Sequence, residues 1–266
     1  MSDRFALRVG GTLSADIAVP EHAREVRFYS RVLGTGESPL WREDLMNNRG
    51  MPIIGLGPQS PEYGELPLQW MPHIQVADVA ASVERALGLG GSEVLHGKDD
   101  EGNSQWAVLL DPNGAAFGLI PVVSGEAAAP YAESALPDAT APVGCIAWLD
   151  LTVADAAAAR DFYRGVIGWS AQDVEASDGG ETYADFEMLG GDGKPAAGIR
   201  HARGANQARP PIWLLHLPVG DLGESLRRVH EEGGEVLLQT PGTESAPAQV
   251  VIRDPVGACL ALVQSH

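Results

Sequence analysis

Cysteines, aromatic side chains and long apolar runs are all scarce in this chain of 266 residues. Two cysteines are too few for a disulfide scaffold, and no CxxC motif typical of a zinc site occurs. No segment approaches the roughly twenty apolar residues that a membrane helix requires. The first nineteen residues also lack the basic start and apolar run of a secretory signal. Together these absences predict a cytoplasmic protein.

Basic residues are the next shortage, because 18 lysines and arginines face 36 acidic residues and give a formal net charge of −18. Such a charge repels nucleic acid phosphates and anionic lipid surfaces, so neither is expected as a partner. Hydrophobic residues make up 44% of the chain, which is ordinary for a globular protein. The length suits one to two domains with proper cores.

The chain repeats itself. Segments of the second half match segments of the first at an offset of 143 residues, or of 134 near the front of each half. The matching segments are DPNGAAFGL (111–119) with DPVGACLAL (254–262), WMPHIQVADV (70–79) with WLLHLPVGDL (213–222), and FYSRVLG (28–34) with FYRGVIG (162–168). Constant offsets over separate blocks indicate a duplication. The sequence therefore predicts two modules, at 12–120 and 144–266, joined by a linker rich in proline and alanine at 121–143.

Each half reads as strand, helix and strands, twice over. The first helix of module one is predicted to start at Pro20 and to end at Gly34 with a left-handed cap. Its counterpart is predicted to follow Asp155 and to end at Gly168. The Phe-Tyr pair inside each helix lies on one apolar face with the aliphatic residues four positions later, which is typical of core packing.

Three segments of the second half carry a resemblance to a known family: LTVADAAAARDFYRGVIGW (151–169), LPVGDLGESLRRVHEEGGEVL (217–237) and RDPVGACLALVQ (253–264), each with a partner in the first half. They resemble the vicinal oxygen chelate (VOC) superfamily of glyoxalases, bleomycin resistance proteins and extradiol dioxygenases. The plan is most similar to two-module actinobacterial proteins labelled glyoxalase-like or hydroxylase, some encoded beside antibiotic pathways. The resemblance implies an α+β fold in which each module is a pair of βαβββ units, forming a cup-shaped mixed sheet with helices outside.

The parity of each expected strand sorts its side chains into a helix-facing set and a cup-facing set. Apolar residues at alternate positions, such as Ala15, Ile17 and Val19, suit the helix layer. Residues of the opposite parity are predicted to line the cups and to bind substrate: Ser14, Met71, Gln75, Gly118, Trp148, Thr152, Leu214, Cys259 and Ala261.

The resemblance also locates the metal ligands of metal-using relatives, which occupy three strand positions in a module. In this chain those positions hold Ser14, Met71 and Gly118 in module one, and Trp148, Leu214 and Ala261 in module two. None of the six is a competent ligand for a divalent metal. We therefore expect no metal site and no cofactor, and glyoxalase or extradiol dioxygenase chemistry, which needs the ion, is disfavoured. The small residues and added apolar surface suit a bulky, flat ligand instead.

Polar side chains remain in both cups, namely Asp16 and His73 in module one and Asp150 and His216 in module two. A histidine beside a carboxylate can act as general acid or base near neutral pH, so these four are the predicted catalytic residues. Two other interpretations stay open. Each pair could simply satisfy its own hydrogen bonds, or the four could form a displaced two-His, one-carboxylate metal site. The sequence leaves open whether the pairs form within or between modules.

The function predicted is metal-independent binding, and acid/base transformation, of a bulky aromatic natural product. One alternative is a binding protein that sequesters an antibiotic; the other is a metalloenzyme with displaced ligands. A small molecule is the expected partner, and the chain is expected to be a monomer or a homodimer. The remaining histidines singled out, His96, His201 and His230, are predicted to be solvated.

Overall fold

The computed structural model describes residues 7–36, 53–124, 145–243 and 247–265. It divides into two compact units that do not coincide with the two halves of the sequence. Unit 1 combines residues 1–13, 71–132 and 149–213, and unit 2 combines residues 14–70, 133–148 and 214–266. Each unit therefore joins one half of the first repeat to one half of the second.

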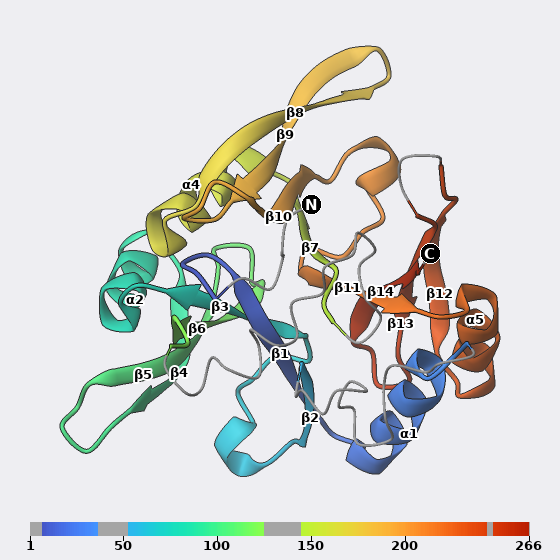
Figure 1. Cartoon of the computed structure of the whole chain (residues 1–266), viewed down its shortest axis with the longest axis horizontal. Helices are drawn as coiled ribbons and strands as arrows, with labels where there is room; N and C mark the ends of the chain where they lie inside the picture. Colours follow the sequence, from blue (N-terminus) through green and yellow to red (C-terminus); the bar gives the residue numbers. More distant parts are fainter. Residues whose placement is uncertain (1–6, 37–52, 125–144, 244–246, 266) are drawn as a thin grey trace. The chain divides into compact units, whose positions relative to one another are not determined.

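Unit 1 contains two βαβββ motifs. The first comprises β3 (Met71–Val76), α2 (Val79–Gly88), β4 (Ser92–Lys98), β5 (Ser104–Leu110) and β6 (Ala116–Pro121). The second comprises β7 (Trp148–Val153), α4 (Ala156–Ile167), β8 (Ser170–Asp178), β9 (Glu181–Leu189) and β10 (Pro195–His201), followed by a 3-10 turn (Gly204–Asn206). Strands β3 and β7 run parallel to β6 and β10, respectively, and the other pairings, β6–β5–β4 and β10–β9–β8, are antiparallel. Helices α2 and α4 pack side by side (Figure 1).

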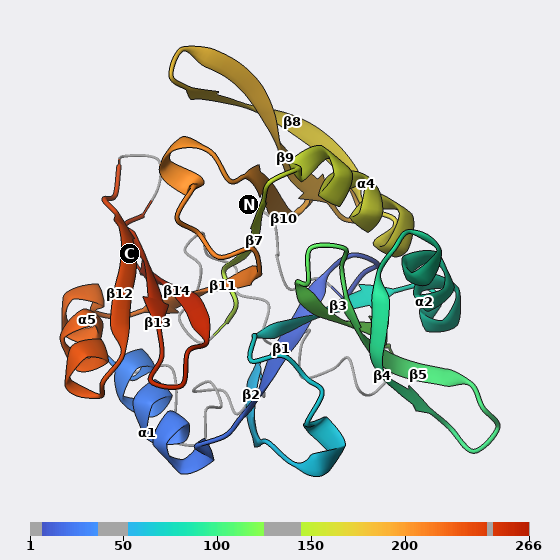
Figure 2. The same ribbon diagram turned by 180° about the vertical axis from the view of Figure 1, so that it is seen from behind.

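Unit 2 also combines segments of both repeats. It holds β1 (Thr12–Val19), α1 (His22–Leu33), β2 (Ile54–Pro58) and a 3-10 turn (Pro61–Tyr63) from the first repeat. From the second repeat it holds β11 (Trp213–Val219), α5 (Leu222–Glu231), β12 (Glu235–Thr240), β13 (Gln249–Arg253) and β14 (Cys259–Gln264). Strand β1 is parallel to β2 and β11 to β14, while β14–β13–β12 is antiparallel. Helix α1 lies along α5 (Figure 2). The predicted α+β class is confirmed.

The helix bounds follow local sequence signals closely. Asp155 caps α4 by accepting a hydrogen bond from the amide of Ala158 at 2.9 Å, and Gly168 ends the helix with the left-handed φ of 87° that favours glycine. Helix α1 also ends before its predicted glycine, Gly34, but the φ there is −84°, so the expectation of a left-handed cap was wrong. The helix begins at His22, two residues after the predicted Pro20.

A buried aromatic relay links the two repeats inside unit 1. The indole of Trp213 donates to the hydroxyl of Tyr163 at 2.8 Å, and that hydroxyl donates to the carboxylate of Asp111 at 3.2 Å. The other oxygen of Asp111 accepts the amides of Asn113 and Ala115, which closes the turn after β5. The aspartate–proline turn of one repeat is thereby held by the helix of the other.

Unit 2 repeats this relay with the roles of the repeats exchanged. Trp70 donates to the hydroxyl of Tyr29 at 3.2 Å, and Tyr29 donates to Asp254 at 2.8 Å. Burial raises the pKa of Tyr29, so the phenol remains a hydrogen-bond donor. The predicted assignment of the Phe-Tyr pairs to the core is confirmed, since Phe28 and Tyr29 are almost completely buried. In each unit, a tyrosine of one repeat is therefore hydrogen-bonded to the aspartate–proline turn of the other repeat.

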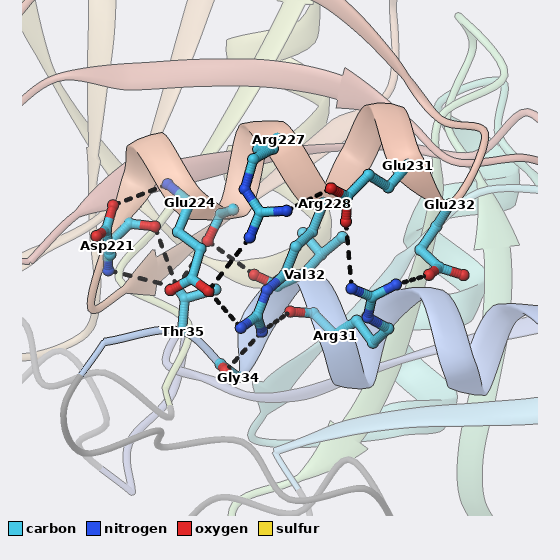
Figure 3. Close-up of polar contacts among 11 residues, drawn as sticks. Arg31, Val32, Gly34, Thr35, Asp221, Glu224, Arg227, Arg228, Glu231 and Glu232 are labelled. Atoms are coloured by element: carbon cyan, nitrogen blue, oxygen red, sulfur yellow. Dashed lines mark hydrogen bonds and ion pairs between the residues drawn. The ribbon is translucent and has the colours of Figure 1, made fainter.

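An arginine also joins the two paired helices of each unit, and we call this contact the arginine stitch. Figure 3 shows the one between α1 and α5. Arg228 of α5 donates to the carbonyl oxygens of Arg31 and Gly34 at the end of α1, at 2.7 and 3.0 Å. Arg85, its counterpart on α2, donates to the carbonyls of Gly165 and Val166 at the end of α4, at 2.7 and 3.1 Å. A cation at a helix C-terminus satisfies carbonyls that lack helical partners and opposes the negative end of the helix dipole.

Candidate functional site

The polar face of β7 and β10 in unit 1 gathers three functional side chains. In the parallel register Asp150 lies opposite Gly198, and Thr152 lies opposite Arg200. The intervening pair, Leu151 and Ile199, is fully buried on the opposite face. The alternation of the strands therefore places Asp150, Thr152 and Arg200 together, and we call this set the Asp–Thr–Arg cluster.

An ion pair links the two charged members of the Asp–Thr–Arg cluster. The Nε of Arg200 lies 3.5 Å from a carboxylate oxygen of Asp150. Gly198 makes room for this pair, because a Cβ there would lie 2.2 Å from the Asp150 oxygen and 3.1 Å from the guanidinium. The strand thus needs glycine at 198, because any larger residue would collide with the Asp150 carboxylate and crowd the Arg200 guanidinium.

The matching strands of unit 2 keep half of this arrangement. Asp16 lies opposite Gly55 on β1 and β2, and a Cβ at Gly55 would come within 2.2 Å of its carboxylate. The next pair along the same face is Ala18 and Gly57, where unit 1 has Thr152 and Arg200. Asp16 is exposed. The aspartate-over-glycine geometry is therefore common to both repeats, whereas the arginine and the threonine belong to the second repeat alone.

The predicted catalytic histidines lie against small residues of the neighbouring strands. His73 of β3 is half-buried and opposite Gly118 of β6, where a Cβ would lie 2.7 Å from the imidazole Cδ2. His216 of β11 is buried and opposite Ala261 of β14. Its own carbonyl accepts the amide of Ala147 at 2.8 Å. In both repeats an imidazole thus occupies the space beside the position at which metal-using relatives carry a glutamate.

These positions do not fit the metal centre that the resemblance implies. Met71 and Leu214 are buried apolar side chains, and Gly118 and Ala261 offer no donor atom. Within the part of the chain that the structure describes, no three or more His, Cys, Asp or Glu side chains are grouped so as to hold a metal ion. The donor chemistry at the family positions is therefore wrong for a divalent ion, and no step below passes through one.

The predicted substrate-binding residues differ in how far they are buried. Ser14 and Trp148 are half-buried. The buried members are Met71, Gln75, Gly118, Thr152, Leu214, Cys259 and Ala261. Gln75 also supports the backbone, since it donates to the carbonyl of Gly11 and accepts the amide of Val123. Burial raises the pKa of the Cys259 thiol, so this side chain offers apolar surface rather than a nucleophile.

The four predicted catalytic residues are distributed over both units. His73 and Asp150 belong to unit 1, and Asp16 and His216 belong to unit 2. Each unit therefore carries one carboxylate and one imidazole, drawn from different repeats. That a carboxylate and an imidazole pair at the site stays a prediction, and both the pairing within a module and the pairing between modules stay open.

Two histidines predicted to be solvated instead have partners. The Nδ1 of His201 lies 3.1 Å from Oδ1 of the buried Asp185, which also accepts the His201 amide at 2.8 Å. His96 bridges Glu93 and Ser104 at 2.9 and 2.8 Å. Both predictions were wrong, while His230 is exposed as expected. Arg200 was also missed, because its place beside Asp150 depends on the register between β7 and β10.

Two family models match the chain, one in each repeat. The model described as glyoxalase-like domain matches residues 13–120. The model described as glyoxalase/bleomycin resistance protein/dioxygenase superfamily matches residues 145–262. The matches flank the segment predicted to be the linker.

Similar proteins come from actinobacteria. The chain is 28% identical over 208 residues to the anthracycline biosynthesis protein DauV of Streptomyces sp. strain C5, which covers 78% of this chain and 70% of that protein. It is 32% identical over 120 residues to a Mycobacterium bovis protein that bears the provisional name glyoxylase CFP32, and this match covers 45% of either protein. The chain thus aligns with less than half the length of the mycobacterial protein.

Among solved structures, the 2,2',3-trihydroxybiphenyl 1,2-dioxygenase of Sphingomonas wittichii RW1 is similar, with a TM-score of 0.54 and 19% identity. The alignment covers 97% of this chain and 91% of that chain. At this identity the likeness concerns the fold alone. Among the helices of the described residues, none has the length and apolar character of a membrane span.

Proposed function

Because this chain belongs to the glyoxalase/bleomycin resistance protein/dioxygenase superfamily as two tandem modules, we propose that it binds a bulky aromatic small molecule without a metal ion and transforms it by acid/base chemistry. The observation that carries the proposal is that residues without metal-binding atoms stand where metal-using relatives carry a glutamate ligand. Donorless residues stand at Gly118 and Ala261, and a titratable imidazole lies against each on the neighbouring strand. A proton-transferring group has replaced an electrophilic ion.

The ligand class is supported by the residues that surround those imidazoles and by the relatives. Glycine and alanine stand where a glutamate would project, and Met71, Leu214 and Trp148 add apolar side chains. The similar DauV is named for anthracycline biosynthesis, and anthracyclines are fused aromatic compounds. A flat polycyclic natural product fits both observations.

In the proposed mechanism the protein's own side chains hold the substrate and move its protons. An imidazole can act as a general base and then as a general acid, so His73 or His216 can take a proton from a substrate C–H or O–H bond and return it elsewhere. The electron pair of the broken bond stays on the substrate, either on the oxygen of the former O–H bond or, after C–H cleavage beside a carbonyl group, on the oxygen of the enolate. Asp16 and Asp150 orient the imidazoles or accept the proton themselves. Apolar walls exclude water from the reacting atoms.

Native mass spectrometry of the purified full chain, before and after chelator treatment, tests metal independence. We expect the mass of the bare chain, or of the chain with an organic adduct, and no change on chelation. A stoichiometric first-row metal removed by the chelator would contradict the proposal. It would favour the displaced site formed by Asp16, His73, Asp150 and His216.

Replacing His73 and His216 with glutamine separates an enzyme from a binding protein. The probe is 2-hydroxyanthraquinone, followed by its quenching of tryptophan fluorescence and by chromatographic detection of any product. For an enzyme, we expect binding to survive in both variants and turnover to fall by about 10²-fold or more. Binding without turnover in the wild type would instead support sequestration, the alternative in which the protein captures an antibiotic.

A further inference from the structure

We propose that the Asp–Thr–Arg cluster of β7 and β10 is the subsite that binds a phenolic or enolic hydroxyl of the ligand, which makes the second module the working one. This inference rests on the proposed function, because it names the polar group of the same ligand. The metal positions of the relatives do not include these three residues.

Arg200 has N–H donors available for a ligand in addition to the one that approaches Asp150. Its guanidinium has five N–H donors, and its one polar contact among the described residues is the 3.5 Å approach of Nε to Asp150. The side chain is 26% exposed, so a ligand can reach it. An arginine held by one carboxylate, with most of its donors unused, is a preorganised oxygen-binding group.

Thr152 supplies a second, independent observation. Its side chain is 1% exposed, and its hydroxyl oxygen has no hydrogen-bond partner among the described residues. A buried hydroxyl without a partner costs on the order of 1–3 kcal/mol, so such groups usually mark a place for a ligand or a water. Thr152 lies directly opposite Arg200 in the strand register. The N–H donors of Arg200 and the hydroxyl of Thr152 therefore lie on neighbouring residues of the same sheet face.

The combination of groups selects a hydroxyl on an sp² carbon. Such a group needs an acceptor for its proton and donors for its oxygen. Asp150 accepts, Arg200 donates, and the Thr152 hydroxyl can do either. If the ligand loses its proton to Asp150, the O–H bond of the ligand breaks, an O–H bond forms on the carboxyl group, and the electron pair stays on the ligand oxygen. The guanidinium then neutralises that oxyanion.

The first module lacks this subsite although it keeps the supporting geometry. Asp16 still lies over Gly55, but Ala18 and Gly57 stand at the positions of Thr152 and Arg200. Duplication gave both modules the same starting residues, so the difference distinguishes one module from the other. The polar end of the ligand is accordingly assigned to β7 and β10.

The test compares 2-hydroxyanthraquinone with 2-methoxyanthraquinone, in which the hydroxyl is blocked, by fluorescence titration of the full chain. We expect the wild type to prefer the hydroxyl compound by about tenfold, the scale of one charge-assisted hydrogen bond. Arg200→Gln and Thr152→Val should each reduce that preference and leave binding of the methoxy compound nearly unchanged. Thermal unfolding of each variant checks that the fold is retained.

Arg203→Gln is the matched control, since it makes the same charge change three residues away. Arg203 pairs with the exposed Glu181 at 2.8 Å and stacks on Tyr183. It should keep the wild-type preference. If both compounds bind and Arg200→Gln leaves the preference intact, the subsite is wrong while the proposed ligand class stands.

If neither anthraquinone binds the wild type, the bulky aromatic ligand itself is wrong, and a small phenol decides the subsite. Titration of 4-hydroxyacetophenone, with 4-methoxyacetophenone as the blocked partner, would be followed by the NMR signal of the Arg200 Nε–H group. A shift caused by the phenol alone supports the subsite independently of the larger ligand. The absence of any shift overturns the subsite as well.

Discussion

At the scale of single residues, Glu25 is the main difference between the two buried relays. It lies in α1 at the position that Ala159 occupies in α4. Glu25 is fully buried, and neither carboxylate oxygen has a hydrogen-bond partner within the described residues that meets normal geometry. Burial, and then the nearby Asp254, raise its pKa to about 8. One module therefore carries a buried acid that the other does without.

The first prediction follows from that pKa. A carboxyl group whose pKa rises from 4.5 to about 8 on folding stabilises the fold fully below pH 4.5, and loses that contribution as the pH rises through 8. We expect the wild type to lose roughly 2–4 kcal/mol of unfolding free energy between pH 6 and pH 9 through this group. Urea unfolding at both pH values should show a smaller loss in Glu25→Gln.

The exposed Glu84 of α2 provides the control for this experiment. Glu84→Gln removes the same charge at the surface and should leave the pH dependence as in the wild type. An unchanged pH dependence in Glu25→Gln would show that Glu25 is ionised in the folded protein. Other groups near Glu25 act in the same direction or against it: Asp254 and Glu21 raise its pKa, and Arg24 lowers it.

Strand parity accounts for the strand faces on which two of the candidate residues lie. Asp150 and His73 lie on the faces opposite the buried Leu151 and Ile74, as alternation requires. Arg200 and His201 were missed for different reasons. Arg200 needed the register between β7 and β10, which local pattern does not contain. His201 contacts Asp185 of the neighbouring strand β9, and this pairing depends on how β9 and β10 align.

At the scale of elements, the two arginine stitches explain how each helix pair is held. Arg85 and Arg228 stand at equivalent positions, and each donates to the carbonyls that end the partner helix. Helix bounds were predictable because caps such as Asp155 act within a few residues. The partner of each helix was not predictable, since α1 could pack on α2 or on α5 with nearly the same residues, and only long-range contacts decide.

The second prediction concerns these stitches. Arg228→Ala should lower the unfolding free energy by about 1–3 kcal/mol, because it leaves the carbonyls of Arg31 and Gly34 without their charged donor. Within the described residues, its neighbour Arg227 forms ion pairs with Glu224 and Glu231 at the surface. Arg227→Ala should cost under about 0.5 kcal/mol. Equal midpoints of thermal unfolding for the two variants would refute the stitch.

At the scale of the whole molecule, duplication and compact units divide the chain differently. The family matches follow the two repeats, whereas each compact unit combines segments of both repeats. Tyr29 finds Asp254 and Tyr163 finds Asp111 across that division. A single repeat contains both kinds of residue, since the first repeat carries Tyr29 as well as Asp111. A chain of one repeat would therefore have to find its partner in a second copy.

The last prediction uses this property. Fragments 1–130 and 131–266, expressed alone, each lack the partner of both their helices, so neither should fold as a monomer. We expect each to expose apolar surface or to form a homodimer in which Tyr29 meets Asp111, or Tyr163 meets Asp254, of the second copy. Mixing the two fragments should restore a complex with the mass and the unfolding midpoint of the intact chain. Light scattering and circular dichroism measure these outcomes. A fragment that stays monomeric and unfolds cooperatively would show that a single repeat is a self-sufficient unit, and that the stitches between repeats are secondary to the packing within each one.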